Sequence, residues 1–170
     1  MIRTTVIVVP PDPTWPARFE AEALRLRALF GDEMLTVHHV GSTSVPGLWA
    51  KPIVDLMPLV RSIDRLAALR PAVEAAGFLW RGEYGIPGRC YVRNDDLNVH
   101  MYEPGHHEVA RHLAFRDHLR AHPEARDAYA ALKRDLAARF THQREAYQDG
   151  KSALIEALLR DAMGDAYIGP

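Results

Sequence analysis

The stretch from His39 to Met57, HVGSTSVPGLWAKPIVDLM, contains the residue types that bind phosphate. Gly41 has no Cβ, so a ligand can approach the backbone closely at that position. Ser42 adds a hydroxyl group, and the amides at the start of a short helix point outward, which favours anions. The pattern predicts a phosphate-binding turn at Gly41 and Ser42, with Thr43 as a further candidate.

Two charged residues follow this turn. Asp55 lies on the next predicted strand, where its carboxylate could hold a divalent cation against the same phosphates. Lys51 is a nearby cation that could contact a phosphate directly. The alternative interpretation is a plain strand, turn and helix with an N-cap serine and a surface aspartate, and the spacing alone leaves both open.

The elements that must position these residues follow from hydrophobic periodicity and turn chemistry. The predicted strands are Leu35–Val40, Ile53–Val60, Phe78–Trp80, Arg89–Arg93 and Leu97–Tyr102, with Val6–Val9 as a short strand or extended arm. The predicted helices are one capped by Thr14 that stops near Gly31, then Ile63–Ala76, 107–121, 124–140 and 144–163, before a tail over 161–170. Strands followed by helices indicate an α+β fold.

Composition restricts the class of protein. The 170 residues predict one domain spanning 1–170, and 48% hydrophobic with 25% charged residues is typical of a globular chain. A formal net charge of −1 argues against nucleic acid as a partner. The apolar run Val6–Val9 is too short for a signal or membrane segment. The single cysteine, Cys90, excludes an intramolecular disulfide and fits a cytoplasmic location.

The string HVGSTSVPGLWAKPIVDL resembles the signature of the GrpB family, a branch of the nucleotidyltransferase superfamily. Other parts of the chain are similar to the family in the same order. They are Pro11–Pro16 with Phe19 and Glu20, Glu103–Gly105, His112–Asp117, Leu119–Pro123, and Tyr147 followed by Lys151. The resemblance covers nearly the whole chain.

This resemblance implies a nucleotidyltransferase-like mixed β-sheet flanked by helices, with a helical C-terminal half. It also implies an ancestral transfer of a nucleotidyl group from a nucleoside triphosphate to a small molecule, assisted by Mg²⁺ or Mn²⁺. The superfamily pattern has a second acid two residues after the first, whereas this chain has Met57 two residues after Asp55. A thioether is a poor ligand for Mg²⁺, which puts a two-metal mechanism in doubt.

A later strand offers a further ligand. Asn98 and His100 are two residues apart on the strand Leu97–Tyr102, so they project from the same face. The family often has His-apolar-His here, and the superfamily usually takes its third acid from such a strand. His100 with Asp55 is therefore a candidate catalytic and metal site. The alternative is a half-buried histidine hydrogen-bonded within the sheet.

Basic residues elsewhere are candidates for phosphate contact because arginine and lysine bind phosphate oxygens. Arg116, Tyr147 and Lys151 lie on predicted helices that could close over a triphosphate, and Arg89 begins a strand near the phosphate turn. Each could instead be a structural or solvated charge. Of the pair before the turn, His39 is expected near the pocket and His38 away from it.

Two functions from different classes remain. One is an enzyme that binds a nucleoside triphosphate and transfers its nucleotidyl group to a small molecule. The other is a degenerate, non-catalytic protein that binds a nucleotide or phosphometabolite, which Met57 favours. The sequence does not fix the donor nucleotide, the acceptor, the number of metals or the oligomeric state.

Overall fold

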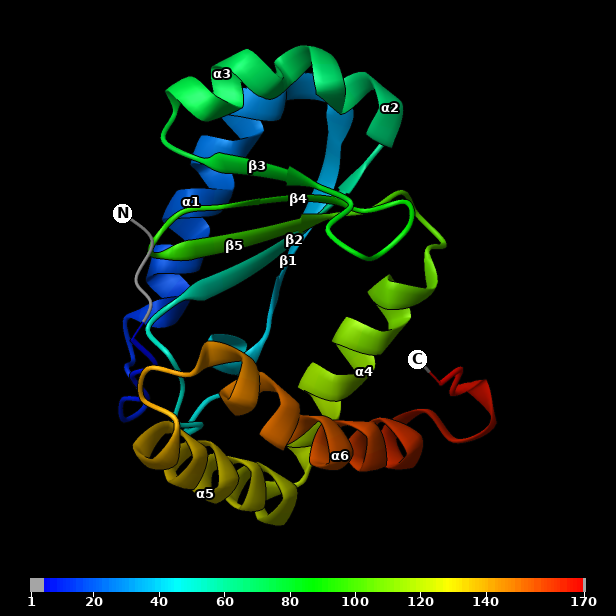
Figure 1. Ribbon diagram of the computed structural model, residues 1–170. Coiled ribbons are helices and arrows are strands. Elements are labelled where there is room, and N and C mark those ends of the chain that lie inside the picture. Colours follow the sequence, from blue (N-terminus) through cyan, green and yellow to red (C-terminus); the bar gives the residue numbers. More distant parts are fainter. Residues whose placement is uncertain (1–4, 170) are drawn as a thin grey trace.

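A five-stranded sheet forms the centre of the structure, a computed structural model that describes residues 5–169 (Figure 1). Its strands are β1 (Met34–Val40), β2 (Val54–Val60), β3 (Leu79–Gly82), β4 (Cys90–Arg93) and β5 (Leu97–Met101). The α-helices are α1 (Trp15–Phe30), α2 (Ile63–Leu66), α3 (Arg70–Ala75), α4 (His107–Ala121), α5 (Pro123–Arg139) and α6 (Arg144–Met163).

The strand order is β1-β2-β5-β4-β3. Strands β2 and β5 pair in parallel, with Asp55 opposite Asn98, and the other neighbours pair antiparallel. The sheet is therefore mixed. Because the helices α4 to α6 follow the last strand, the predicted α+β fold with a helical C-terminal half is confirmed.

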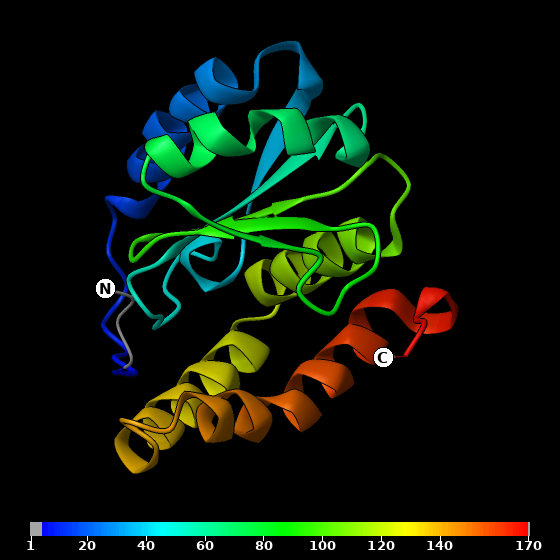
Figure 2. The same cartoon turned by 45° about the horizontal axis from the view of Figure 1, so that its top comes forward.

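Alternation along the strands divides the sheet into two faces. On β5, Leu97, Val99 and Met101 are buried in the largest hydrophobic cluster, which also contains Leu26 of α1 and Val73 of α3. Figure 2 shows α1 and the α2–α3 segment together over this face, and α4 beneath the other. The polar side chains of β2 and β5 are thereby directed toward α4 and the helices that follow it.

The three C-terminal helices pack on one another around a separate apolar cluster. Leu119 of α4, Tyr129 of α5 and Leu158 of α6 meet there with Leu48, which comes from the connection between β1 and β2. Pro123 begins α5, where its missing N–H and fixed φ are tolerated. This packing places the connection between β1 and β2, which contains the predicted phosphate turn, against the helices.

One predicted helix is interrupted. The segment predicted as a continuous helix over Ile63–Ala76 forms α2, a 3₁₀ turn over Ala67–Leu69, and then α3. Pro71 lies in the first turn of α3, where a proline lacks the N–H that would continue the preceding helix. The break is the physical consequence of that proline.

The two chain ends agree with the predicted elements. Residues Val6–Val9 form an extended arm, in which Val6 donates to the carbonyl of Thr141 and Val9 forms a single bridge with Ala50. Helix α6 ends at Met163, the predicted end of this helix, and Pro170 lies outside the described residues. Within residues 5–169, no helix combines the length and apolar character that crossing a membrane requires.

Candidate functional site

The glycine turn lies directly against Asp55. Gly41 follows β1 with φ +69 and ψ −173, and a 3₁₀ turn over Ser42–Ser44 comes next. A Cβ on Gly41 would stand 2.5 Å from Oδ2 of Asp55. The missing Cβ therefore allows the Asp55 carboxylate to lie directly against Gly41, which brings the phosphate turn and the carboxylate together. The close approach of a ligand to Gly41 stays a prediction.

Replacing Gly41 with Ala is expected to destabilise the protein more than the same change at Gly31. Both glycines have positive φ, so each substitution carries strain of about 1–3 kcal/mol. Only the new Cβ at Gly41 meets Asp55, because nothing lies within 4 Å of a Cβ at Gly31. We expect a further loss of about 1–3 kcal/mol for Gly41→Ala, measured by urea unfolding. Equal losses at the two positions would contradict the close approach of Asp55 to Gly41.

Asp55 is the centre of a polar cluster on the sheet. The side-chain amide of Asn98 donates to Oδ1 of Asp55 at 2.9 Å, and Nε2 of His100 lies 3.3 Å from the same oxygen. Tyr91 donates its hydroxyl to Oδ1 of Asn98 at 2.8 Å. Burial raises the pKa of Asp55, but the contacts with His100 and Asn98 outweigh it, and the pKa lies below its ordinary value. Asp55 is thus a carboxylate at neutral pH.

The position of the missing second acid is apolar. Met57 is fully buried in a cluster with Val40 and Tyr102. Within residues 5–169 no group of three or more His, Cys, Asp and Glu side chains is disposed to hold a metal ion. Asp55 and His100 are brought together as expected, but Mg²⁺ prefers oxygen ligands and a two-metal centre requires more carboxylates. These residues do not fit such a centre.

Three lysines from three different elements converge beside the turn. Lys133 of α5 is 2% exposed and donates to Oγ of Ser42 at 2.9 Å. The Nζ atoms of Lys151 on α6 and Lys51 before β2 lie 4.5 and 5.9 Å from the ring centroid of Tyr147. Buried lysines are rare unless they are paired, so a cluster of three lysines in this position is unusual.

The pKa values of these lysines reflect their crowding. Burial, followed by the charges of Lys151 and Lys51, lowers the pKa of Lys133 to about 7. Burial and the charge of Lys51 lower the pKa of Lys151 to about 8. Burial also lowers the pKa of Lys51, although Asp55 opposes the shift. An anion bound between them would relieve the repulsion and favour the charged forms.

These groups line a cavity of about 530 Å³ between the sheet and helices α4 to α6. Its basic and acidic lining residues are Lys51, Arg89, Arg111, Lys133, Arg144 and Lys151, against Asp55 and Glu108. Gly41, Ser42, His100 and Tyr147 also line it. The cavity is therefore strongly cationic although the chain as a whole has a net charge of −1.

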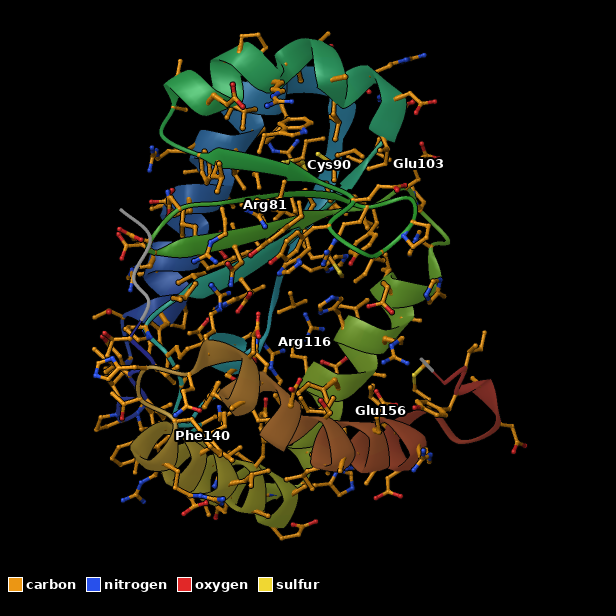
Figure 3. All side chains as sticks on the ribbon, viewed as in Figure 1. Arg81, Cys90, Glu103, Arg116, Phe140 and Glu156 are labelled. Atoms are coloured by element: carbon orange, nitrogen blue, oxygen red, sulfur yellow. The ribbon has the colours of Figure 1, made fainter. Side chains whose placement is uncertain are left out.

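Two of the proposed phosphate ligands do not line this cavity. Thr43 is 4% exposed, and its hydroxyl lies 2.9 Å from Nε2 of His39. Arg116, labelled on α4 in Figure 3, donates to the carbonyl of His39 at 3.1 Å and to Asp117 at 2.7 Å. Both residues connect the phosphate turn or β1 to their surroundings, and a role for them in binding phosphate stays a prediction.

Arg89 lines the cavity, but its guanidinium is hydrogen-bonded to backbone carbonyls. It is 7% exposed, and it donates through Nε to the carbonyl of Glu83 at 3.1 Å and through Nη2 to that of Tyr84 at 2.7 Å. The structure thus gives Arg89 a role in shaping the loop between β3 and β4. A contact between its guanidinium and phosphate remains a prediction.

His39 lies next to the phosphate turn, where its Nε2 is 2.9 Å from the Thr43 hydroxyl, but its side chain does not line the cavity. Its ring stacks on Phe19 of α1, with centroids 4.7 Å apart, and burial lowers its pKa to about 4. The reason is strand alternation: Val40 pairs with Asp55 and shares its face, whereas His39 pairs with Leu56 and points to the opposite side.

Sequence reasoning missed Lys133 and its neighbour Tyr129. A signal was present, because the buried residues of α5 are Tyr129, Ala130, Lys133 and Leu136, which form one stripe at helical spacing. A lysine within an apolar stripe is a candidate for a buried functional charge.

The GrpB family model matches residues 5–161 of the chain. The chain belongs to the GrpB family. A solved GrpB protein from Enterococcus faecalis is 37% identical to it, with a TM-score of 0.88 over 92% of this chain and 96% of that one. The family resemblance of the HVGSTSVPGLWAKPIVDL string is confirmed.

Two relatives named UPF0157 proteins are similar to most of the chain. A UPF0157 protein of Halalkalibacterium halodurans is 40% identical over 154 residues, which span 89% of this chain and 79% of that protein. A UPF0157 protein of Bacillus subtilis is 41% identical over 152 residues, 87% of this chain but 44% of that protein. The chain thus matches less than half the length of the Bacillus relative.

Proposed function

We propose that this GrpB protein binds a nucleoside triphosphate in the cavity through its phosphate groups. The observation that supports this most strongly is the convergence of Lys51, Lys133 and Lys151 beside the Ser42 hydroxyl. Phosphate oxygens are the ligands that suit buried ammonium groups and a serine hydroxyl. A cavity of about 530 Å³ is large enough for a small-molecule ligand.

The proposal assigns each group a role. Lys133 and Ser42 contact the same phosphate, because their side chains already lie 2.9 Å apart. Lys51 and Lys151, on either side of Tyr147, neutralise the neighbouring phosphate charge. The lysines replace the charge that metal ions supply in a two-metal centre, so binding requires no divalent cation.

A thermal-shift panel of ATP, GTP, CTP, UTP and inorganic tripolyphosphate tests this proposal. At about a hundredfold excess over Kd, a bound ligand stabilises the folded state by about 2.7 kcal/mol. We expect a raised Tm with tripolyphosphate and at least one nucleotide, of similar size in EDTA and in Mg²⁺. Adenosine, which lacks phosphate, is the control and should give no shift. Absence of a shift with every phosphate compound would overturn the proposal.

Nucleotidyl transfer is the second candidate, favoured by the ionised Asp55 next to the phosphate turn. In that reaction the hydroxyl oxygen of a small acceptor attacks the α-phosphorus, and the bond from that phosphorus to the bridging oxygen breaks. Asp55 takes the hydroxyl proton, and pyrophosphate leaves into the lysine cluster. A pyrophosphate-release assay with a panel of small hydroxyl compounds, run beside Asp55→Asn, tests it. Nucleotide binding without pyrophosphate release would leave the protein as a non-catalytic binder.

A further inference from the structure

The wall of the cavity beyond Asp55 is aromatic. His100, which contacts Asp55, stacks on Tyr91 with ring centroids 5.0 Å apart, and Tyr91 lies 5.7 Å from Tyr84. All three rings line the cavity. The cavity lining thus continues from the lysine cluster and Ser42 past Asp55 to an aromatic surface that ends at Tyr84. A ligand with phosphates at the lysines could therefore extend toward the rings.

Tyr84 has an unusual conformation. Among residues 5–169 it is the one non-glycine residue with positive φ, at +43. The residue is also 58% exposed, although it lines the cavity. Residues other than glycine adopt this conformation at an energetic cost, and such strain tends to occur where ligands bind.

Three hydrogen bonds hold the loop that carries Tyr84. The buried Arg89 donates to the carbonyls of both Glu83 and Tyr84. The N–H of Gly88 donates to the Glu83 carboxylate at 2.8 Å, which closes the loop on itself. Arg81, labelled on β3 in Figure 3, places its guanidinium 4.2 Å from the Tyr84 ring centroid. These contacts hold the backbone of the loop in place before any ligand binds, which lowers the entropic cost of contact.

We infer that Tyr84 is a stacking platform for the planar ring of the ligand, so that the ligand is an aromatic-base nucleotide and not an inorganic or sugar polyphosphate. This inference rests on the proposed binding of phosphate by the lysines. Stacking on an aromatic side chain tolerates every base, because each base has a π-face. Stacking on Tyr84 therefore contributes affinity for nucleotides but discriminates little among their bases.

The test compares ATP with inorganic tripolyphosphate by calorimetric titration of the wild type, Tyr84→Phe and Tyr84→Asn. Asn tolerates a positive φ, so Tyr84→Asn removes the ring while preserving the loop conformation. We expect Tyr84→Asn to weaken ATP about tenfold and tripolyphosphate less than about twofold. Tyr84→Phe keeps the ring and should stay within about threefold for both ligands.

Three results would overturn the inference. An equal loss of both ligands in Tyr84→Asn would mean that the residue only supports the loop, and unchanged ATP affinity would mean that no ring stacks there. If the wild type bound neither ligand, the proposed function itself would fail along with this inference. Thermal unfolding of Tyr84→Asn without ligand, with a Tm close to that of the wild type, verifies that the variant is folded.

Discussion

Replacing Lys133 with Met is expected to weaken the binding of tripolyphosphate and ATP by about a hundredfold. The variant removes a buried ammonium group that lies 2.9 Å from the Ser42 hydroxyl, at the place where the phosphate is proposed to bind. A hydrogen bond to a charged group in a buried site contributes more than one at the surface. Calorimetric titration at physiological salt in EDTA measures the change in Kd.

Arg139→Met is the matched control for this experiment. Arg139 lies on the same helix, its side chain is 61% exposed, and it pairs with Asp135 outside the cavity. Like Lys133→Met, the Arg139→Met substitution removes one basic side chain. Comparing the two variants therefore separates the loss of a contact in the cavity from the change in net charge. We expect less than about a twofold change in Kd, because exposed charges are screened by salt. Similar losses in both variants would contradict a specific phosphate site at Lys133.

The second prediction with a large expected effect concerns how the stability of the unliganded protein depends on pH. Burial lowers the pKa of Lys133 from 10.5, the value of an unperturbed lysine, to about 7 in the folded protein. Between these values the unfolded chain binds the additional proton, so the free energy of unfolding rises with pH across this window. The slope from one such group approaches about 1.4 kcal/mol per pH unit. The destabilisation caused by burying the charged amine of Lys133 is complete below about pH 7 and disappears as the pH rises toward 10.5.

Lys133→Met removes this titration and should therefore reduce the slope. The groups that surround the amine are Ser42, Tyr129, Lys51, Lys151 and Asp55, and all of them remain in the variant. We expect the variant to be more stable than the wild type by about 1–3 kcal/mol at pH 6.5, with the gain shrinking by pH 9. Urea unfolding at several pH values measures both curves. Parallel curves would show that Lys133 keeps an ordinary pKa in the folded state.

Local patterns in the sequence were sufficient for the sheet and for part of the site. The runs that became β1, β2 and β5 are apolar and bounded by turn residues. The spacing of Asn98 and His100 predicted their shared face, and the parallel register of β2 and β5 then places both beside Asp55. Period-2 alternation is a local property, so a single sequence reveals it.

The lysine cluster depends on packing between distant segments. Lys133 and Ser42 are 91 positions apart, and nothing in α5 alone indicates which segment its buried stripe will contact. The orientation of α4 could not be predicted from the sequence either. Arg116 and Arg120 both lie on its inner side, but they donate to the carbonyls of His39 and Ser44 and so hold the phosphate turn. Arg116 and Arg120 are four residues apart and therefore share a face of the helix, but this spacing does not indicate what that face contacts.

A crystal structure of the protein with ATP, grown in EDTA, tests the central claim most directly. The account predicts phosphate oxygens within hydrogen-bond distance of Lys133 Nζ and Ser42 Oγ, no metal ion beside Asp55, and the adenine ring against Tyr84. ATP bound at another surface, or in this cavity with its phosphates away from the lysines, would contradict the account.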